Sequence, residues 1–145
     1  MLTFPIHTKT IWNDYFTGNP TLYQSNVYGA TRTLSGTSVY FLDCLFASCT
    51  STSHGGAFYC TSVTYLLVES TSFFSCTTSN SDGGAIYFDN SNGQCVLHEV
   101  CGYDCCSTRS GSSSYQFAYI YVNDAASSKN YMNYSSIVRC VNLRS

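Results

Sequence analysis

The residues best suited to chemistry in this chain are concentrated between positions 94 and 107. This stretch holds Cys95, His98, Cys101 and the adjacent pair Cys105-Cys106. Thiolate and imidazole groups are ligands that zinc prefers in proteins. The spacing does not match a zinc knuckle, which uses two separated Cys-x2-4-Cys pairs. Strand alternation also points His98 and Cys101 to opposite faces. We therefore predict no metal or cofactor site here.

Cysteine is unusually frequent, with nine residues in a chain of 145. An odd number leaves at least one thiol unpaired if the others form disulfides. Free cysteine also behaves as a small hydrophobic residue and is among the most buried residue types. Buried, mostly reduced thiols are our preferred interpretation, and disulfides between neighbouring segments are the alternative. The sequence leaves the redox state open.

The carboxylates are the other candidate catalytic groups. Acid–base chemistry on polysaccharides needs clustered carboxylates, usually with a basic residue beside them. Glu69 and Glu99 fall at equivalent places in the repeat described next, but no Lys or Arg shares that place. We predict no catalytic residue, and a polysaccharide-active enzyme is the least favoured function. The eight acidic residues are Asp14, Asp43, Glu69, Asp82, Asp89, Glu99, Asp104 and Asp124.

One sequence motif occurs twice and defines the repeat of the chain. It reads Phe46-Ala47-Ser48-Cys49 followed by Gly55-Gly56-Ala57, then Phe73-Phe74-Ser75-Cys76 followed by Gly83-Gly84-Ala85. Two looser copies keep an apolar residue three places before a cysteine, as Tyr103 with Cys106 and Ile137 with Cys140. The cysteines are then 27, 30 and 34 residues apart. A period in this range is the signature of a solenoid.

Each copy contains three short runs of β-branched and aromatic residues between turn formers, which is typical of strands. A coil of short strands buries its apolar face only when the next coil stacks on it. The sequence therefore predicts an all-β fold, a right-handed parallel β-helix of about three to four coils with a period of about 27–34 residues; the hand follows the general preference of parallel crossovers. The predicted interior columns are Phe46, Phe73, Tyr103, Ile137 and Cys49, Cys76, Cys106, Cys140, with tight corners at Gly55, Gly56, Gly83 and Gly84.

The repeat resembles that of a known family. Gly83-Gly84-Ala85-Ile86 and Phe73-x-x-Cys76 are similar to the Gly-Gly-Ala-Ile and Phe-x-x-Asn motifs of the polymorphic outer membrane proteins of chlamydiae, with cysteine in place of asparagine. Similar repeats occur in large, cysteine-rich β-helix families of protists. The resemblance covers roughly residues 39 to 140 and weakens after residue 100. It implies a cell-surface or adhesin-like role with a protein or glycan ligand.

The chain divides into two parts by pattern. Residues 1–36 stand outside the clear repeat and contain the only tryptophan, Trp12; we interpret them as an N-terminal cap over the open end or a degenerate first coil. Residues 37–145 form the β-helix coils. Asn133-Tyr134-Ser135 is a glycosylation sequon, which matters only if the chain is secreted.

Composition narrows the functional classes. Only 10% of residues are charged and the net charge is −2, which argues against a nucleic-acid partner. The longest apolar run, residues 117–122, is too short to span a membrane, and no signal peptide is visible. The favoured hypothesis is a non-catalytic surface or adhesin-like module, which we interpret as a fragment of a longer chain. The alternative is a structural protein that self-associates end to end through its open solenoid ends. The compartment is not assigned.

Overall fold

Short runs of β-branched and aromatic residues, separated by Ser, Thr, Gly and Asn, form 17 strands and one four-residue helix in the described part of the chain. The computed structural model describes residues 11–109 and 117–140. All strand pairs there are parallel and join neighbouring coils. The protein is thus a parallel β-solenoid of about four coils, which confirms the predicted fold class.

The strands belong to four parallel sheets, here called A to D, and each sheet takes one strand from successive coils. Sheet A contains β1 (Thr21–Gln24), β4 (Ser38–Leu42), β8 (Tyr65–Glu69), β12 (Gln94–His98) and β16 (Tyr131–Asn133). Sheet B contains β2 (Val27–Tyr28), β5 (Leu45–Ala47), β9 (Ser72–Phe74), β13 (Cys101–Tyr103) and β17 (Ser136–Val138). Sheet C contains β3 (Arg32–Thr33), β7 (Phe58–Cys60), β11 (Ile86–Asp89) and β15 (Ala118–Tyr121). Sheet D contains β6 (Thr50–Ser51), β10 (Thr77–Thr78) and β14 (Cys106–Ser107).

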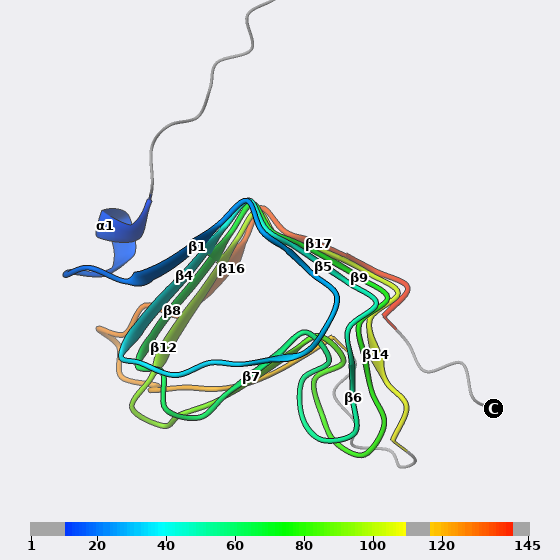
Figure 1. The fold of residues 1–145 in the computed structure, drawn as a ribbon. Coiled ribbons are helices and arrows are strands. Elements are labelled where there is room, and N and C mark those ends of the chain that lie inside the picture. The colour runs from blue at the N-terminus through cyan, green and yellow to red at the C-terminus, as the bar shows by residue number, and fades with distance from the viewer. Residues whose placement is uncertain (1–10, 110–116, 141–145) are drawn as a thin grey trace, which may run out of the picture.

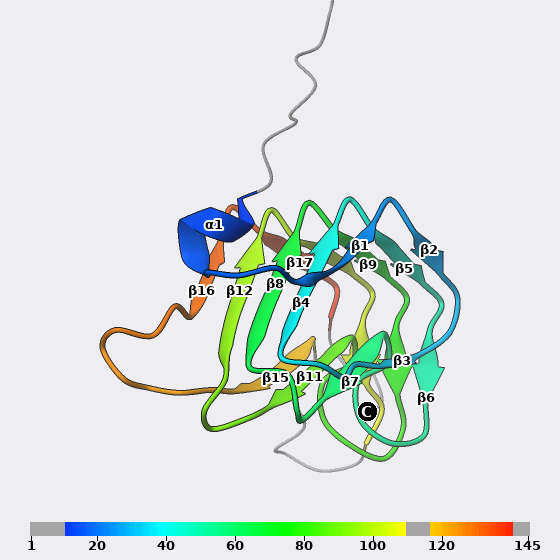
Figure 2. The same ribbon diagram turned by 60° about the vertical axis from the view of Figure 1, so that its left-hand side comes forward.

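The chain visits the sheets in the order A, B, D, C and then returns to A. Viewed along the solenoid axis, sheets A and B meet at the top corner, and the path runs clockwise while successive coils recede (Figure 1). The side view shows the coils stacked as near-parallel rungs (Figure 2). The solenoid is therefore right-handed. Sheet D, with two residues per strand, is a fourth element that the three predicted runs per coil did not include.

Single residues in the left-handed backbone region turn the chain at two corners. At the corner between sheets A and B, Asp43, Ser70 and Glu99 have φ values of 52°, 47° and 54°. Polar residues tolerate this region better than branched apolar ones, which explains why Ser and Asp recur here. The corresponding residues between sheets B and D are Ser48, Ser75, Asp104 and Arg139.

The repeated Gly-Gly pair makes a backbone contact that no side chain permits. Gly55 and Gly83 have φ values of +53° and +72°. A Cβ on Gly55 would lie 2.0 Å from the carbonyl oxygen of Phe58, and a Cβ on Gly56 would lie 2.1 Å from that of Gly84. The chain can follow this path only with glycine. The corresponding corner of the next coil lies outside the described residues.

The interior columns of the later coils differ from the prediction by one residue. Phe46 and Phe73 stack at 5.1 Å between ring centroids, but the next position in register is Gly102, followed by Ile137. The prediction of Tyr103 at this place is wrong. The ring of Phe117 occupies this space instead: a Cβ built on Gly102 would lie only 2.5 Å from it. Tyr103 points outward.

The cysteine column shifts in the same way. The N–H of Cys76 donates to Sγ of Cys105, and the N–H of Cys105 donates to Sγ of Cys140, at 3.4 and 3.3 Å. Cys106 pairs in register with Thr77 in sheet D. The prediction of Cys106 is therefore wrong. The column, called the cysteine column below, consists of Cys49, Cys76, Cys105 and Cys140.

Residues 11–36 contribute strands to the sheets and a cover for the outer face of sheet A. Strands β1, β2 and β3 pair in register with the following coil. The helix α1 (Trp12–Tyr15) lies against the outer face of sheet A and not across the open end (Figures 1 and 2). Trp12 and Phe16 are buried against Tyr40, Leu67 and Val96.

Candidate functional site

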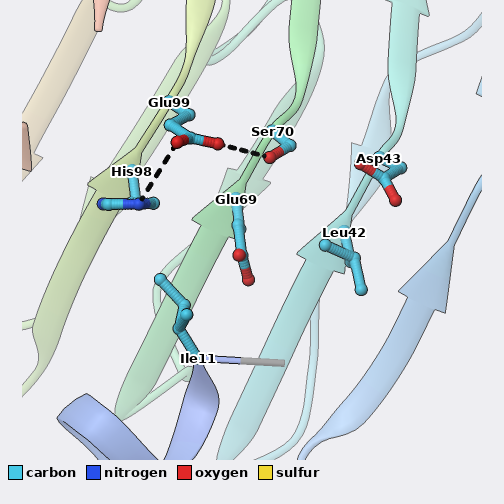
Figure 3. A pocket seen from close by; sticks show the side chains of 7 residues that line it. All are labelled: Ile11, Leu42, Asp43, Glu69, Ser70, His98 and Glu99. Atoms are coloured by element: carbon cyan, nitrogen blue, oxygen red, sulfur yellow. Dashed lines mark hydrogen bonds and ion pairs between the residues drawn. The ribbon is translucent and has the colours of Figure 1, made fainter. Parts of the chain in front are cut away.

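A small groove lies at the corner between sheets A and B, beside the residue that precedes α1. It encloses about 230 Å³. The groove combines three carboxylates with an imidazole, a hydroxyl and two apolar side chains, and none of its described lining residues is Lys or Arg. We call it the corner groove; its lining residues are Ile11, Leu42, Asp43, Glu69, Ser70, His98 and Glu99 (Figure 3).

Strand register places these side chains in two rows. Leu42, Glu69 and His98 end β4, β8 and β12 and pair in register with one another. The residues that follow them form the second row, at the left-handed corner. Glu69 and Glu99 thus belong to different rows, so their predicted equivalence is wrong. The error has the same origin as the cysteine shift, because the third copy was counted from Cys106 instead of Cys105.

Glu69 is the most buried carboxylate of the groove, at 7% exposure. The Tyr40 hydroxyl donates a hydrogen bond to its Oε2. Burial and this hydrogen bond raise the pKa of Tyr40 well above its ordinary value of 10.0. The phenol therefore stays protonated and acts as a fixed donor to Glu69.

Glu99 and His98 form a second network. The Ser70 hydroxyl donates to Glu99 Oε2 at 2.9 Å, and His98 Nε2 lies 3.8 Å from Glu99 Oε1 (Figure 3). His98 Nδ1 lies 2.8 Å from Oδ1 of Asn133, whose amide nitrogen donates to the Tyr15 hydroxyl at 3.4 Å. The network links α1 to the last coil. It also engages the side chain of Asn133, the residue of the sequon.

These contacts give the groove carboxylates structural partners. Glu69 and Glu99 each accept a hydrogen bond from a neighbouring coil. The volume of 230 Å³ lies below the range of about 300–1,000 Å³ typical of small-molecule sites. Within the described ranges, no group of three or more His, Cys, Asp or Glu side chains is placed to hold a metal ion. The hydrogen bonds of Glu69 and Glu99 thus link neighbouring coils.

The cysteine column is a second chemical feature. Seven of the nine cysteines are buried, Cys106 is half-buried and Cys101 is exposed, and none forms a disulfide in the described chain. The hydrogen bond to Cys105 and burial raise the pKa of the Cys76 thiol, whereas that same bond lowers the pKa of Cys105. The backbone N–H groups of Cys76 and Cys105 each donate to the sulfur of the next cysteine, which links neighbouring residues of the column.

The two ends of the solenoid differ in polarity. At the C-terminal end of the described chain, Met132 and Ile120 face inward yet are 53% and 39% exposed, because no described coil lies over them. The residues below them in register, Leu97 and Phe88, are 1% and 0% exposed. The sequence analysis raised open solenoid ends as an alternative but did not identify these residues, because the repeat does not show which side chains the last coil leaves exposed.

At the N-terminal end, polar-tipped side chains take the place of these apolar ones. Tyr23 and Tyr28 stack on Phe41 and Phe46 at 5.0 and 4.7 Å between ring centroids. The Arg32 guanidinium lies over both tyrosine rings, 5.8 and 5.1 Å from their centroids. Arg32 and the two phenols thereby cover the aromatic interior of the first coil.

Comparison with known proteins adds no family: no family model, no curated protein and no solved structure matches the chain. Nor does any helix among the described residues have the length and apolar character needed to cross a membrane.

Proposed function

We propose that the protein is a non-catalytic structural module that self-associates through the C-terminal end of its solenoid. The observation that carries this proposal is the exposure of the inward-facing Met132 and Ile120. Burying a large apolar side chain fully contributes about 1.5–3 kcal/mol, so covering this end is favourable. The C-terminal end surface, as we use the term, consists of the inward-facing Ile120 and Met132 together with Tyr121, Tyr131 and Val138, which lie on the outer faces of the same last strands; all five are exposed.

The strand edges at this end support the same proposal. β15, β16 and β17 are the last strands of sheets C, A and B, and no described strand pairs with their outer edges. An uncovered edge presents backbone N–H and C=O groups that pair readily with another chain. Apolar side chains and free edges together favour a protein partner over a small molecule.

The partner that this surface fits is a second copy of the chain. The two copies would meet through their C-terminal ends and form a dimer. Head-to-tail stacking would set the N-terminal end, with Arg32 and the phenols of Tyr23 and Tyr28, on the apolar end, and would desolvate the guanidinium. Contact between two C-terminal ends buries apolar groups on both sides. Such an isologous contact produces a dimer, whereas head-to-tail contacts produce open filaments.

The test is the molar mass in solution, measured by light scattering after size-exclusion chromatography across the micromolar range. The wild type is expected at twice the chain mass of 16.0 kDa. Met132→Glu should shift the protein to a monomer. Leu22→Glu is the matched control, because Leu22 is an exposed apolar residue of sheet A at the opposite end, and should leave the dimer intact. A monomeric wild type, or dissociation by Leu22→Glu, would overturn the proposal.

A second candidate function is a surface module that binds a glycan, as the resemblance to adhesin-like repeats implies. The observation that favours it is a row of tyrosines on the outer face of sheet C, where Tyr87 lies 5.6 Å from Tyr59 and 4.7 Å from Tyr119 between ring centroids. His54 packs against the same row, 4.2 Å from Tyr87. Tyrosines combine an apolar ring with a polar tip, a pairing suited to recognition surfaces.

Affinity electrophoresis through gels that contain soluble polysaccharides tests this candidate. Binding should retard the wild type in at least one gel, and Tyr87→Ala should abolish the retardation. Phe74→Ala is the control, because Phe74 is an exposed aromatic residue on the outer face of sheet B. Unchanged mobility of the wild type across a broad panel of polysaccharides would contradict the glycan function.

A further inference from the structure

We propose that Cys105 and Cys140 form an oxidation site, in which a peroxide converts the two thiols at the C-terminal end of the cysteine column into a disulfide between neighbouring coils. This site is independent of the self-association proposed above, because both cysteines belong to one chain. It distinguishes one pair from the other thiols of the column.

The geometry brings this pair together. Cys105 and Cys140 each stand two residues after Tyr103 and Val138, which pair in register in sheet B. The N–H of Cys105 donates to Sγ of Cys140 at 3.3 Å, so the Cys140 sulfur lies against the backbone of Cys105. Neighbouring strands lie about 4.8 Å apart, near the low end of the Cα separations of about 4.4–6.8 Å found in disulfides. The register therefore places the two cysteines at a separation that a disulfide can span.

Access favours this end of the column. Cys49, Cys76 and Cys105 are 0% exposed, whereas Cys140 is 8% exposed on the last coil. Ile137, which precedes Cys140 in the same coil, packs against the core only partly buried. Within the cysteine column, a small oxidant such as hydrogen peroxide therefore meets Cys140 first, and Cys105 is the next thiol of the column.

The chemistry proceeds in two displacements. Cys140 loses its proton and its thiolate attacks one peroxide oxygen; the O–O bond breaks, leaving a sulfenic acid on Cys140 and one water. The Cys105 thiolate then attacks the Cys140 sulfur; the S–O bond breaks and the hydroxide leaves as a second water. Two thiols and one hydrogen peroxide thus give one disulfide and two waters.

The local hydrogen bonds suit these two roles. The bond from Cys76 lowers the pKa of Cys105 below its ordinary value of 9.0, which favours the thiolate needed for the second step. Burial raises the pKa of Cys140 to about 11, so the first step should accelerate as the pH rises from 7 to 9. The rate of oxidation, measured between pH 7 and 9, therefore reports on the first step at Cys140.

The test treats the reduced, full-length protein with a few equivalents of hydrogen peroxide and maps its cysteines by non-reducing peptide mass spectrometry. Cys101→Ser serves as the starting protein, because Cys101 is exposed and would oxidise on its own. We expect an intrachain cross-link between the peptides of Cys105 and Cys140, with loss of two hydrogen atoms, reversed by dithiothreitol. Adding Cys140→Ser should abolish the cross-link.

The melting temperature and the circular dichroism spectrum are two further readouts, which separate formation of the disulfide from loss of the fold. The melting temperature should rise by several degrees on oxidation and fall back on reduction, because the disulfide ties the last coil to the one before it. The circular dichroism spectrum shows whether Cys140→Ser retains the fold, and the cross-link map of the Cys101→Ser protein stands without that variant. A disulfide at another pair, or thiols of Cys105 and Cys140 that stay reduced while other cysteines are oxidised, would overturn the proposal.

Discussion

Single residues carry the turns of this solenoid. The corners between sheets A and B use one left-handed residue per coil, and the turns into β7 and β11 of sheet C use the Gly-Gly pair. The first kind accepts Ser, Asp or Glu because the side chain points to solvent or to the corner groove. The second accepts only glycine, because backbone atoms of the same and neighbouring coils fill the space of a Cβ.

Gly55→Ala should therefore be strongly destabilising. The new Cβ meets the Phe58 carbonyl at 2.0 Å in a backbone region of positive φ, and we expect a loss of about 2–4 kcal/mol in the free energy of unfolding. Gly29→Ala is the control, because nothing lies within 4 Å of its Cβ position; its effect should stay within about 0.5 kcal/mol. Urea denaturation measures both. Equal losses would contradict this account of the corner.

Alkaline pH should weaken the fold through its buried thiols. Burial raises the pKa of Cys95 from 9.0 to about 12, so between these values the unfolded chain loses this proton while the folded chain keeps it. The stability from this group is complete below pH 9 and falls by about 1.4 kcal/mol per pH unit up to pH 12. The midpoint of urea denaturation, measured from pH 7 to 11, should decline above pH 9.

Two variants separate Cys95 from the other ionisable groups. Cys95→Ala removes one buried thiol and should make the decline above pH 9 shallower, even though its stability at pH 7 is lower. Cys101→Ala removes an exposed thiol from β13 and should leave the slope as in the wild type. A wild-type midpoint that stays constant from pH 8 to 11 would contradict the burial argument.

Some interior residues could be placed from the sequence and others could not. Phe46, Phe73 and the Gly-Gly pairs could be placed from spacing, because two close copies repeat them. Gly102 could not, because an apolar pattern favours Tyr103, and only the three-dimensional structure shows that Phe117 fills the glycine position. The resulting shift of one residue also placed Cys106 in the column and paired Glu69 with Glu99. The corner groove was therefore not predictable as a set.

At the scale of elements, helix α1 buries the outer face of sheet A, just as the stacked coils bury its inner face. Its outer face carries Tyr40, Leu67 and Val96, which Trp12 and Phe16 cover. Sheet A is therefore apolar on both of its faces, as the continuous apolar runs of β4 and β8 indicate. The sequence showed the runs, but a four-residue helix has no periodicity that predicts where it docks.

Trp12→Ala should remove this cover. Trp12 is 3% exposed, and its indole N–H donates to the Gly18 carbonyl at 2.9 Å. We expect a loss of about 3–5 kcal/mol in the free energy of unfolding. Leu22→Ala, an exposed position on β1, is the control and should cost less than about 1 kcal/mol. Thermal denaturation followed by circular dichroism measures both; a Trp12→Ala effect no larger than the control would show that the helix is not needed.

At the scale of the molecule, the period and the stacked columns follow from the repeat, whereas the character of the ends does not. Repetition predicts what lies between coils, because each coil buries the one before it. The ends depend on single residues outside the pattern, such as Arg32 over the tyrosines and Met132 without a cover. The proposed assembly rests on this difference between the two ends.

The most direct test of that assembly is small-angle X-ray scattering of the wild type and of Met132→Glu. About four coils spaced about 4.8 Å apart make each solenoid only about 20 Å long, so contact between two C-terminal ends doubles the length along the axis and leaves the cross-section unchanged. The wild type should therefore have a larger radius of gyration than the variant and the same cross-sectional radius. A dimer whose cross-sectional radius exceeds that of the variant would associate side by side. That result, or identical curves for the two proteins, would contradict self-association through the C-terminal end surface.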